Sequence, residues 1–228
     1  GYPHVRFQAD IDRMLHFGVD PWRWLHGVAG HGVVRAALEF NYGMVWFSLC
    51  FGGLFFVATS PRADRFRIRY LVMFMLCWVV VGNLLAGVFL SAGPAFYGDV
   101  TGDHARFADL LATLAGSPDT ASPYAYQRYL WSLYESDIKG FGAGISAFPS
   151  VHVALITMNA LFVAERSRLL GALAFVYVAV IAASSVYLGW HYAIDGYVSI
   201  ILVVASHLLV KRYLPAENPV SRSAARVA

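Results

Sequence analysis

Two histidines and one aspartate are the residues of this 228-residue chain best placed to do chemistry. His191 and Asp195 are four positions apart, so on a helix they lie next to each other on one face. A carboxylate there can accept the N–H of one imidazole nitrogen, which fixes the tautomer and leaves the other nitrogen free as a nucleophile or base. A buried pair that only closes a helix end has the same spacing, so the pair alone leaves both roles open.

A third candidate, His152, directly follows Pro149-Ser150-Val151. Proline favours the first turn of a helix, and the N–H groups of a first turn lack helical partners and attract anions. A helix that starts near His191 would present a second such end. Two helix ends, two histidines and a carboxylate suit a lipid phosphate group. The dipoles hold the oxyanion while one histidine attacks and the other handles the proton of the leaving group.

The composition indicates which elements must position these residues. Hydrophobic residues make up 58% of the chain and charged residues only 14%, against about 25% charged in an ordinary soluble domain. Uncharged runs of about 20 residues or more predict membrane-spanning helices. We expect an all-α polytopic membrane helix bundle with five spans, and the start at Gly1 rather than Met leaves room for a sixth upstream. The expected spans lie near 38–59, 70–92, 148–165, 169–189 and 191–211.

Loop charges orient this bundle. The loops at 61–69 and 166–168 and the C-terminal tail are rich in arginine, and the positive-inside rule makes their side cytoplasmic. The segment 93–146 is richer in acidic residues, so it belongs on the outer side. We therefore expect an integral protein of a bacterial cytoplasmic membrane whose candidate site faces the extracytoplasmic side. His207 stands alone near the cytoplasmic end and is expected to be structural or interfacial.

The chain reads as one catalytic domain over 1–228. It comprises an interfacial N-terminal segment at 1–37, an extracytoplasmic roof at 93–146 and a cytoplasmic tail at 215–228. Three stretches outside the spans have amphipathic or aromatic patterns typical of interfacial helices: 9–25, 103–114 and 124–134. Cys50 and Cys77 lie within expected spans and are interpreted as buried hydrophobic residues.

Two short motifs resemble those of a known family. Pro149-Ser150-Val151-His152 resembles the P-S-x-H signature of the type 2 phosphatidic acid phosphatase superfamily. The stretch 184–191 together with Asp195 resembles its S-R-x5-H-x3-D signature. The resemblance covers about 90–200 and implies that His191 attacks phosphorus, Asp195 activates it and His152 protonates the leaving group. It also implies substrate contacts near Pro149, Ser150 and Ser185, with no cofactor or metal.

This sequence departs from the family pattern in lacking positively charged residues of the family motifs. Ser185 stands at the position of the signature arginine, and no K-x6-R-P motif is present. Fewer cations weaken binding of a dianionic phosphate monoester, whereas a singly charged phosphodiester needs less compensation. Three residues are candidates to replace the missing cations: Arg128, Lys139 and Tyr97.

A loop after the second span refines the resemblance. The residues Ser91-Ala92-Gly93-Pro94-Ala95-Phe96-Tyr97 resemble a loop of the aureobasidin-resistance branch, the inositol phosphorylceramide synthases. That branch transfers a phospho-headgroup between lipids. The sequence thus predicts a lipid phosphotransferase that forms a phosphohistidine and acts on a membrane phospholipid and a lipid or polyol alcohol acceptor, with no nucleic-acid partner.

Two alternatives remain open from sequence. One is a phosphatase of lipid phosphate monoesters, of the polyprenyl or phosphatidate type. The other is a non-catalytic lipid carrier or channel in which His191 and Asp195 serve a proton or ion path. Against the channel, the ionisable residues gather at one end of the expected bundle rather than along its depth.

Overall fold

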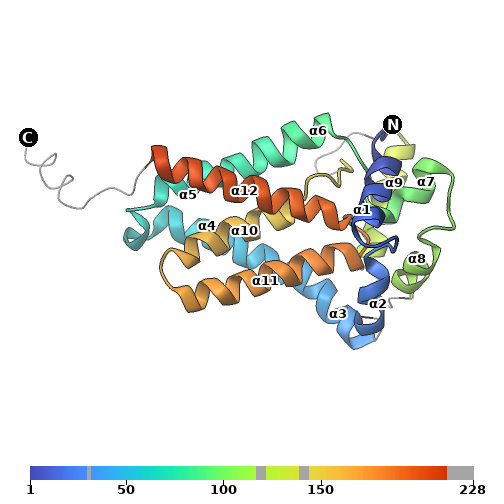
Figure 1. The fold of residues 1–228 in the computed structure, drawn as a ribbon, viewed down its shortest axis with the longest axis horizontal. Coiled ribbons are helices and arrows are strands. Elements are labelled where there is room, and N and C mark those ends of the chain that lie inside the picture. The colour runs from blue at the N-terminus through green and yellow to red at the C-terminus, as the bar shows by residue number, and fades with distance from the viewer. Residues whose placement is uncertain (30–31, 117–121, 139–143, 215–228) are drawn as a thin grey trace, which may run out of the picture.

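A computed structural model describes residues 1–29, 32–116, 122–138 and 144–214, and in these ranges every regular element is helical (Figure 1). The bundle contains two composite helices, each with a π-helical segment between α-helical parts. The first joins α3 (Gly32–Phe40), η1 (Asn41–Val45) and α4 (Trp46–Thr59). The second joins α5 (Arg67–Leu76), η3 (Cys77–Leu85) and α6 (Ala86–Val88). Three further bundle helices follow: α10 (Val151–Ala164), α11 (Arg168–Tyr187) and α12 (Ala193–Tyr213).

Short helices gather at one end of the bundle (Figure 1). They are α1 (Val5–Leu15), α2 (Trp22–Ala29), α7 (Tyr97–Thr101), α8 (Ala108–Ala115) and α9 (Pro123–Glu135). The 3-10 turn η4 (Pro94–Phe96) leads into α7, and a second turn, η2 (Pro61–Ala63), lies between α4 and α5 at the far end. The expected roof segment 93–146 is thus joined by the N-terminal helices at the same end, opposite the arginine-rich loops.

The expected number of spans needs a correction. Four described helices are long and apolar enough to cross a membrane: Gly32–Thr59, Arg67–Val88, Arg168–Tyr187 and Ala193–Tyr213. The expected third span, 148–165, is instead the 14-residue helix α10, about 21 Å long at 1.5 Å per residue and shorter than a hydrocarbon core of about 30 Å. α10 packs against both α11 and α12, and its Val153, Ala154 and Leu155 are fully buried. Its apolar sequence therefore reflects burial in protein.

The N-terminal segment also differs from expectation. The stretch 9–25 is two helices, α1 and α2, because Phe17 and Gly18 adopt positive φ values of 58° and 80° and turn the chain. Arg13 on α1 stabilises this turn by donating from Nε to the Gly18 carbonyl at 2.7 Å. The first span then begins at Gly32 rather than near residue 38.

A polar cluster joins the helices at the arginine-rich end. Arg69 forms a two-pronged ion pair with Glu165, with Nη2 to Oε2 at 2.9 Å. His207 and Lys211 of α12 reach the same carboxylate at 3.2 and 3.1 Å. His207 thus links α12 to the end of α10, which accords with the structural role expected for it. Cys50 and Cys77 are free and buried, as expected.

Candidate active site

His191 lies in the turn between α11 and α12, and its two ring nitrogens face different partners. Nδ1 is 2.6 Å from the Ala147 carbonyl oxygen and 3.3 Å from Oδ2 of Asp195. Both partners accept hydrogen bonds, so the neutral ring carries its proton on Nδ1. Nε2 therefore holds a lone pair, and it accepts from the Ser150 hydroxyl at 3.1 Å. This tautomer is the one that a nucleophilic histidine requires.

Asp195 is fully buried at the start of α12. Its Oδ2 accepts the backbone N–H of Tyr192 at 2.9 Å as well as contacting His191. Its other oxygen, Oδ1, has no hydrogen-bond partner among the described residues. The spacing predicted contact between His191 and Asp195, and the structure places it there, although the shorter bond of Nδ1 goes to Ala147.

His152 is held between two aromatic rings. Its imidazole stacks on Tyr42 with ring centres 4.5 Å apart and on Trp46 at 3.9 Å. The Trp46 indole N–H also donates to the His152 carbonyl at 3.0 Å. No described residue forms a hydrogen bond with the ring nitrogens of His152. Both faces of the ring are therefore covered while its edge stays available to a ligand.

The two helix ends expected to bind an anion differ in the structure. At α10, Ser150 is the N-cap, and its hydroxyl oxygen accepts the Val153 N–H at 3.4 Å. At α12, protein carboxylates occupy the first turn: Asp195 takes the Tyr192 N–H and Asp12 takes the Ile194 N–H at 3.0 Å. The expectation of a second open helix end is therefore wrong, because α1 covers it.

A cavity of about 820 Å³ joins His152 and His191. Pro149, Ser146 and Trp190 line it near the histidines. Among the described residues that line it, Arg35 is the only Arg or Lys, and Glu39 is the only acidic residue. Arg35 lies 3.8 Å from Glu39 and donates to the carbonyl of Gly116 at 3.0 Å. Within the described lining, the one cation is thus already balanced by a carboxylate.

Three other predicted substrate contacts, Ser185, Arg128 and Tyr97, do not line the cavity. Ser185 is buried and donates to the Ala182 carbonyl, so its hydroxyl does not line the cavity. Arg128 pairs with Asp99 at 2.8 Å, and Tyr97 packs against the ring of Phe107. Neither Arg128 nor Tyr97 lines the cavity. Lys139 lies outside the described residues.

Four residues of the first composite helix belong to the site without having been singled out from sequence. Arg35, Glu39 and Tyr42 line the cavity, and Trp46 stacks on His152. Tyr42 and Trp46 are four positions apart, as are Arg35 and Glu39. This spacing shows that each pair shares a helix face. It does not show that the face points at a histidine from another helix.

The loop at 91–97 packs against the turn that precedes His191. The Ala95 N–H donates to the Gly189 carbonyl at 3.0 Å, and the Ser91 carbonyl accepts the Ala147 N–H at 2.8 Å. Gly93 is required at this contact, because a Cβ there would lie 2.0 Å from the Trp190 carbonyl oxygen. The loop therefore supports both Ala147 and the turn that hold His191.

The fold and this cavity define an all-α integral membrane protein in which two histidines and a buried aspartate meet at one end of the bundle. Residues 8–209 match the PAP2 superfamily, the type 2 phosphatidic acid phosphatases, and the chain belongs to it. No curated protein and no solved structure matches significantly. Membership of this superfamily indicates a lipid enzyme of the phosphatase or phosphotransferase type.

Proposed function

We propose that the protein is a lipid phosphotransferase that moves a phospho-headgroup from a membrane phospholipid to an alcohol, with His191 as the nucleophile. The observation that carries the proposal is the pair of contacts at Nδ1 of His191, which leaves the lone pair on Nε2 at the cavity wall. In the rival role of a carrier or channel, nothing requires this tautomer of His191.

The proposed reaction has two displacement steps. Nε2 of His191 displaces the Ser150 hydroxyl and attacks phosphorus, and the bond from phosphorus to the lipid alcohol breaks while His152 gives that oxygen a proton. In the second step His152 takes the proton of the acceptor hydroxyl. The acceptor oxygen then attacks phosphorus, the P–N bond breaks and His191 is restored. Water as acceptor would give hydrolysis by the same steps.

The charge of the cavity favours a phosphodiester as substrate. Arg35 and Glu39 have side chains only 12% and 11% exposed, and their formal charges cancel. A dianionic monoester would bring two negative charges to a site whose described cation is already balanced, whereas a diester brings one. The diester is therefore the better match to the described lining.

The position of the cavity favours a substrate that stays in the membrane. Part of its lining comes from Phe40 and Met44 of the first composite helix, which are 62% and 61% exposed on the bundle surface. Gly82 and Ala86 of the second composite helix line it as well. We infer that the cavity opens sideways between these two helices, at the expected outer, extracytoplasmic side of a bacterial cytoplasmic membrane.

Headgroup transfer can be measured directly. The purified protein in vesicles of phosphatidylinositol, phosphatidylethanolamine and phosphatidylglycerol would be given a fluorescent ceramide or diacylglycerol, and the products resolved by mass spectrometry. A fluorescent lipid that carries a new phospho-headgroup is the expected product. Release of inorganic phosphate from phosphatidate or polyprenyl phosphate, without transfer, would show a phosphatase instead. No turnover of either kind would contradict both functions.

Exchanging the charges of the cavity is expected to change substrate preference. Arg35→Gln removes a charge-assisted contact worth about 1.5–3 kcal/mol, so KM for a phosphodiester should rise about 10-fold or more. Glu39→Gln leaves Arg35 unbalanced and should raise the kcat/KM of a phosphate monoester relative to a diester. The control is Arg23→Gln, because Arg23 pairs with Asp109 on the surface and does not line this cavity. An unchanged preference in Glu39→Gln would contradict the charge argument.

Tyr42 and Trp46 form an aromatic clamp around His152, and shortening the Trp46 side chain is expected to lower kcat. Trp46→Phe keeps a ring face but loses the indole N–H bond, whereas Trp46→Ala removes both contacts. A stacked aromatic pair contributes about 0.5–1.5 kcal/mol, so kcat should fall about 2- to 12-fold in Trp46→Ala and less in Trp46→Phe. Steady-state rates on a diester lipid check this, and equal KM values would show that the clamp acts on the reaction rather than on binding.

A further inference from the structure

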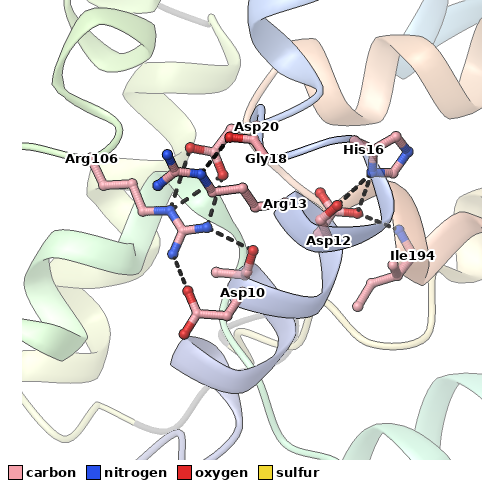
Figure 2. Close-up of polar contacts among 9 residues, drawn as sticks. Asp10, Asp12, Arg13, His16, Gly18, Asp20, Arg106 and Ile194 are labelled. Atoms are coloured by element: carbon pink, nitrogen blue, oxygen red, sulfur yellow. Dashed lines mark hydrogen bonds and ion pairs between the residues drawn. The ribbon is translucent and has the colours of Figure 1, made fainter.

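Helix α1 contacts the first turn of α12 through Asp12 and Ile194 (Figure 2). Asp12 of α1 is only 2% exposed, and its Oδ1 accepts the backbone N–H of Ile194 at 3.0 Å. Ile194 directly precedes Asp195. A carboxylate far away in the sequence therefore occupies a helix end that the first turn of α12 leaves open.

A second contact fixes the angle at which α1 docks. His16 points Nδ1 at the Asp12 carbonyl at 2.6 Å, and its Nε2 lies 2.9 Å from the hydroxyl of Tyr197 on α12. Because Nδ1 faces an acceptor, the neutral His16 ring donates from Nδ1 and accepts from Tyr197. Ile194 and Tyr197 are neighbours on one helix face, so α1 contacts α12 at two adjacent points.

Two carboxylates thus divide the N–H groups at the start of α12. Asp195 serves Tyr192 and Asp12 serves Ile194. An unsatisfied N–H in a first turn attracts a carboxylate of the same turn, as helix capping shows. Without Asp12, the carboxylate that could meet the free N–H is Asp195 itself, and that movement would weaken its contact with His191 Nδ1.

Among the residues that the structure describes, no arginine pairs with the carboxylate of Asp12. Arg106 pairs with Asp10 at 2.6 Å and with Asp20 at 2.9 Å (Figure 2). The groups that face Asp12 are His16 of α1, Asp20 of the following loop and Asp195 of α12. Burial raises the pKa of Asp12, and hydrogen bonds from the N–H groups of Ile194 and Ala193 oppose that rise. Helix N–H dipoles are therefore the main support for this negative charge.

We propose that Asp12 is a positioning residue for the reaction: it accepts a free backbone N–H at the start of α12 and so keeps Asp195 in contact with His191. The proposal rests on the proposed function in taking His191 as the nucleophile. It assigns to the N-terminal helix α1 a part in catalysis, although α1 contributes no group to the cavity.

The test compares three substitutions in the full chain in nanodiscs. Asp12→Ala removes both acceptor and charge, Asp12→Asn keeps an acceptor oxygen, and Asp10→Asn is the matched control on the exposed side of the same helix. We expect kcat to fall about 10-fold in Asp12→Ala, with KM within about twofold, a smaller loss in Asp12→Asn and none in Asp10→Asn.

A chemical readout separates positioning from mere stability. The rate of carbethoxylation of His191 by diethyl pyrocarbonate, followed by mass spectrometry against pH, reports the neutral imidazole without any lipid substrate. If Asp195 moves away from His191, the positively charged form of the His191 ring loses its negative neighbour and is disfavoured. The acid limb of the rate–pH profile should therefore move to lower pH in both Asp12 variants. An unmoved limb, or losses equal in Asp10→Asn, would overturn the proposal. If the wild type turns over no phospholipid, the proposed function fails, while this profile still decides the role of Asp12.

Discussion

Replacing His191 by glutamine is expected to stop headgroup transfer, with the rate falling by at least about 10³-fold. Glutamine fills a similar volume but has no ring lone pair to attack phosphorus. Asp195→Asn should cost about 10²-fold or more, because an amide no longer stabilises the positive ring that forms when Nε2 bonds to phosphorus. Both losses should appear in kcat with diester lipids presented in vesicles.

The intermediate distinguishes the roles of the two histidines. With a headgroup labelled in its phosphate and a nitrophenyl leaving group, His152→Gln should still form the phosphoenzyme, because that leaving group needs no proton. The label should then accumulate on His191 as an acid-labile, base-stable adduct, since the second step lacks its base. A lack of label on His191 in His152→Gln, or full activity in His191→Gln, would refute the assignment.

A substitution at His104 serves as the control for general damage to the fold. His104 lies exposed at the same end of the molecule, next to Gly98 and away from the cavity. His104→Gln should therefore retain wild-type rates under every condition above. A similar loss in His104→Gln would mean that the assay responds to stability at that end of the bundle rather than to chemistry.

Local spacing predicted the part of the site that depends on one helix turn. His191 and Asp195 are in contact, as their four-residue spacing predicted, although the structure places His191 in the turn just before α12 and Asp195 in the first turn of that helix. The shorter bond of Nδ1 to Ala147 could not be predicted, since it comes from a backbone carbonyl of a segment remote in sequence. The same limit applies to the clamp on His152, whose rings belong to the first composite helix.

Hydropathy predicted the class of fold but not the role of every apolar run. α10 is as apolar as a lipid-facing helix, yet it has only 14 residues and its side chains pack on α11 and α12. A high content of apolar residues shows that a helix avoids water, but it does not show whether lipid or protein surrounds that helix. The sequence did not predict that the N-terminal end of α12 is occupied, for a related reason. The sequence of α12 alone indicates a helix end with free N–H groups, whereas the carboxylate of Asp12 reaches that end only because α1 docks there.

Filling the side opening of the cavity is expected to block long-chain lipids selectively. Gly43 lies in the π-helical segment η1 and lines the cavity, and a Cβ there would meet nothing within 4 Å. Gly43→Leu therefore adds a side chain to the space through which we infer that the acyl chains pass. Overfilling a well-fitted site costs about 1–3 kcal/mol, so kcat/KM for a long-chain diester should fall about 5- to 150-fold. A short-chain diester should lose much less.

Gly52→Leu is the matched control. Gly52 lies further along the same composite helix on α4, is also exposed, and has nothing within 4 Å of its Cβ position, but it does not line the cavity. Both variants make the same change in a membrane-spanning helix, so a difference between them isolates the opening. Equal losses in the two variants, or equal losses on short and long chains in Gly43→Leu, would contradict sideways access. Substrate would then have to reach His191 from the end of the bundle covered by α1, α8 and α9, and the exposed apolar side chains Phe40 and Met44 would contact only surrounding lipid.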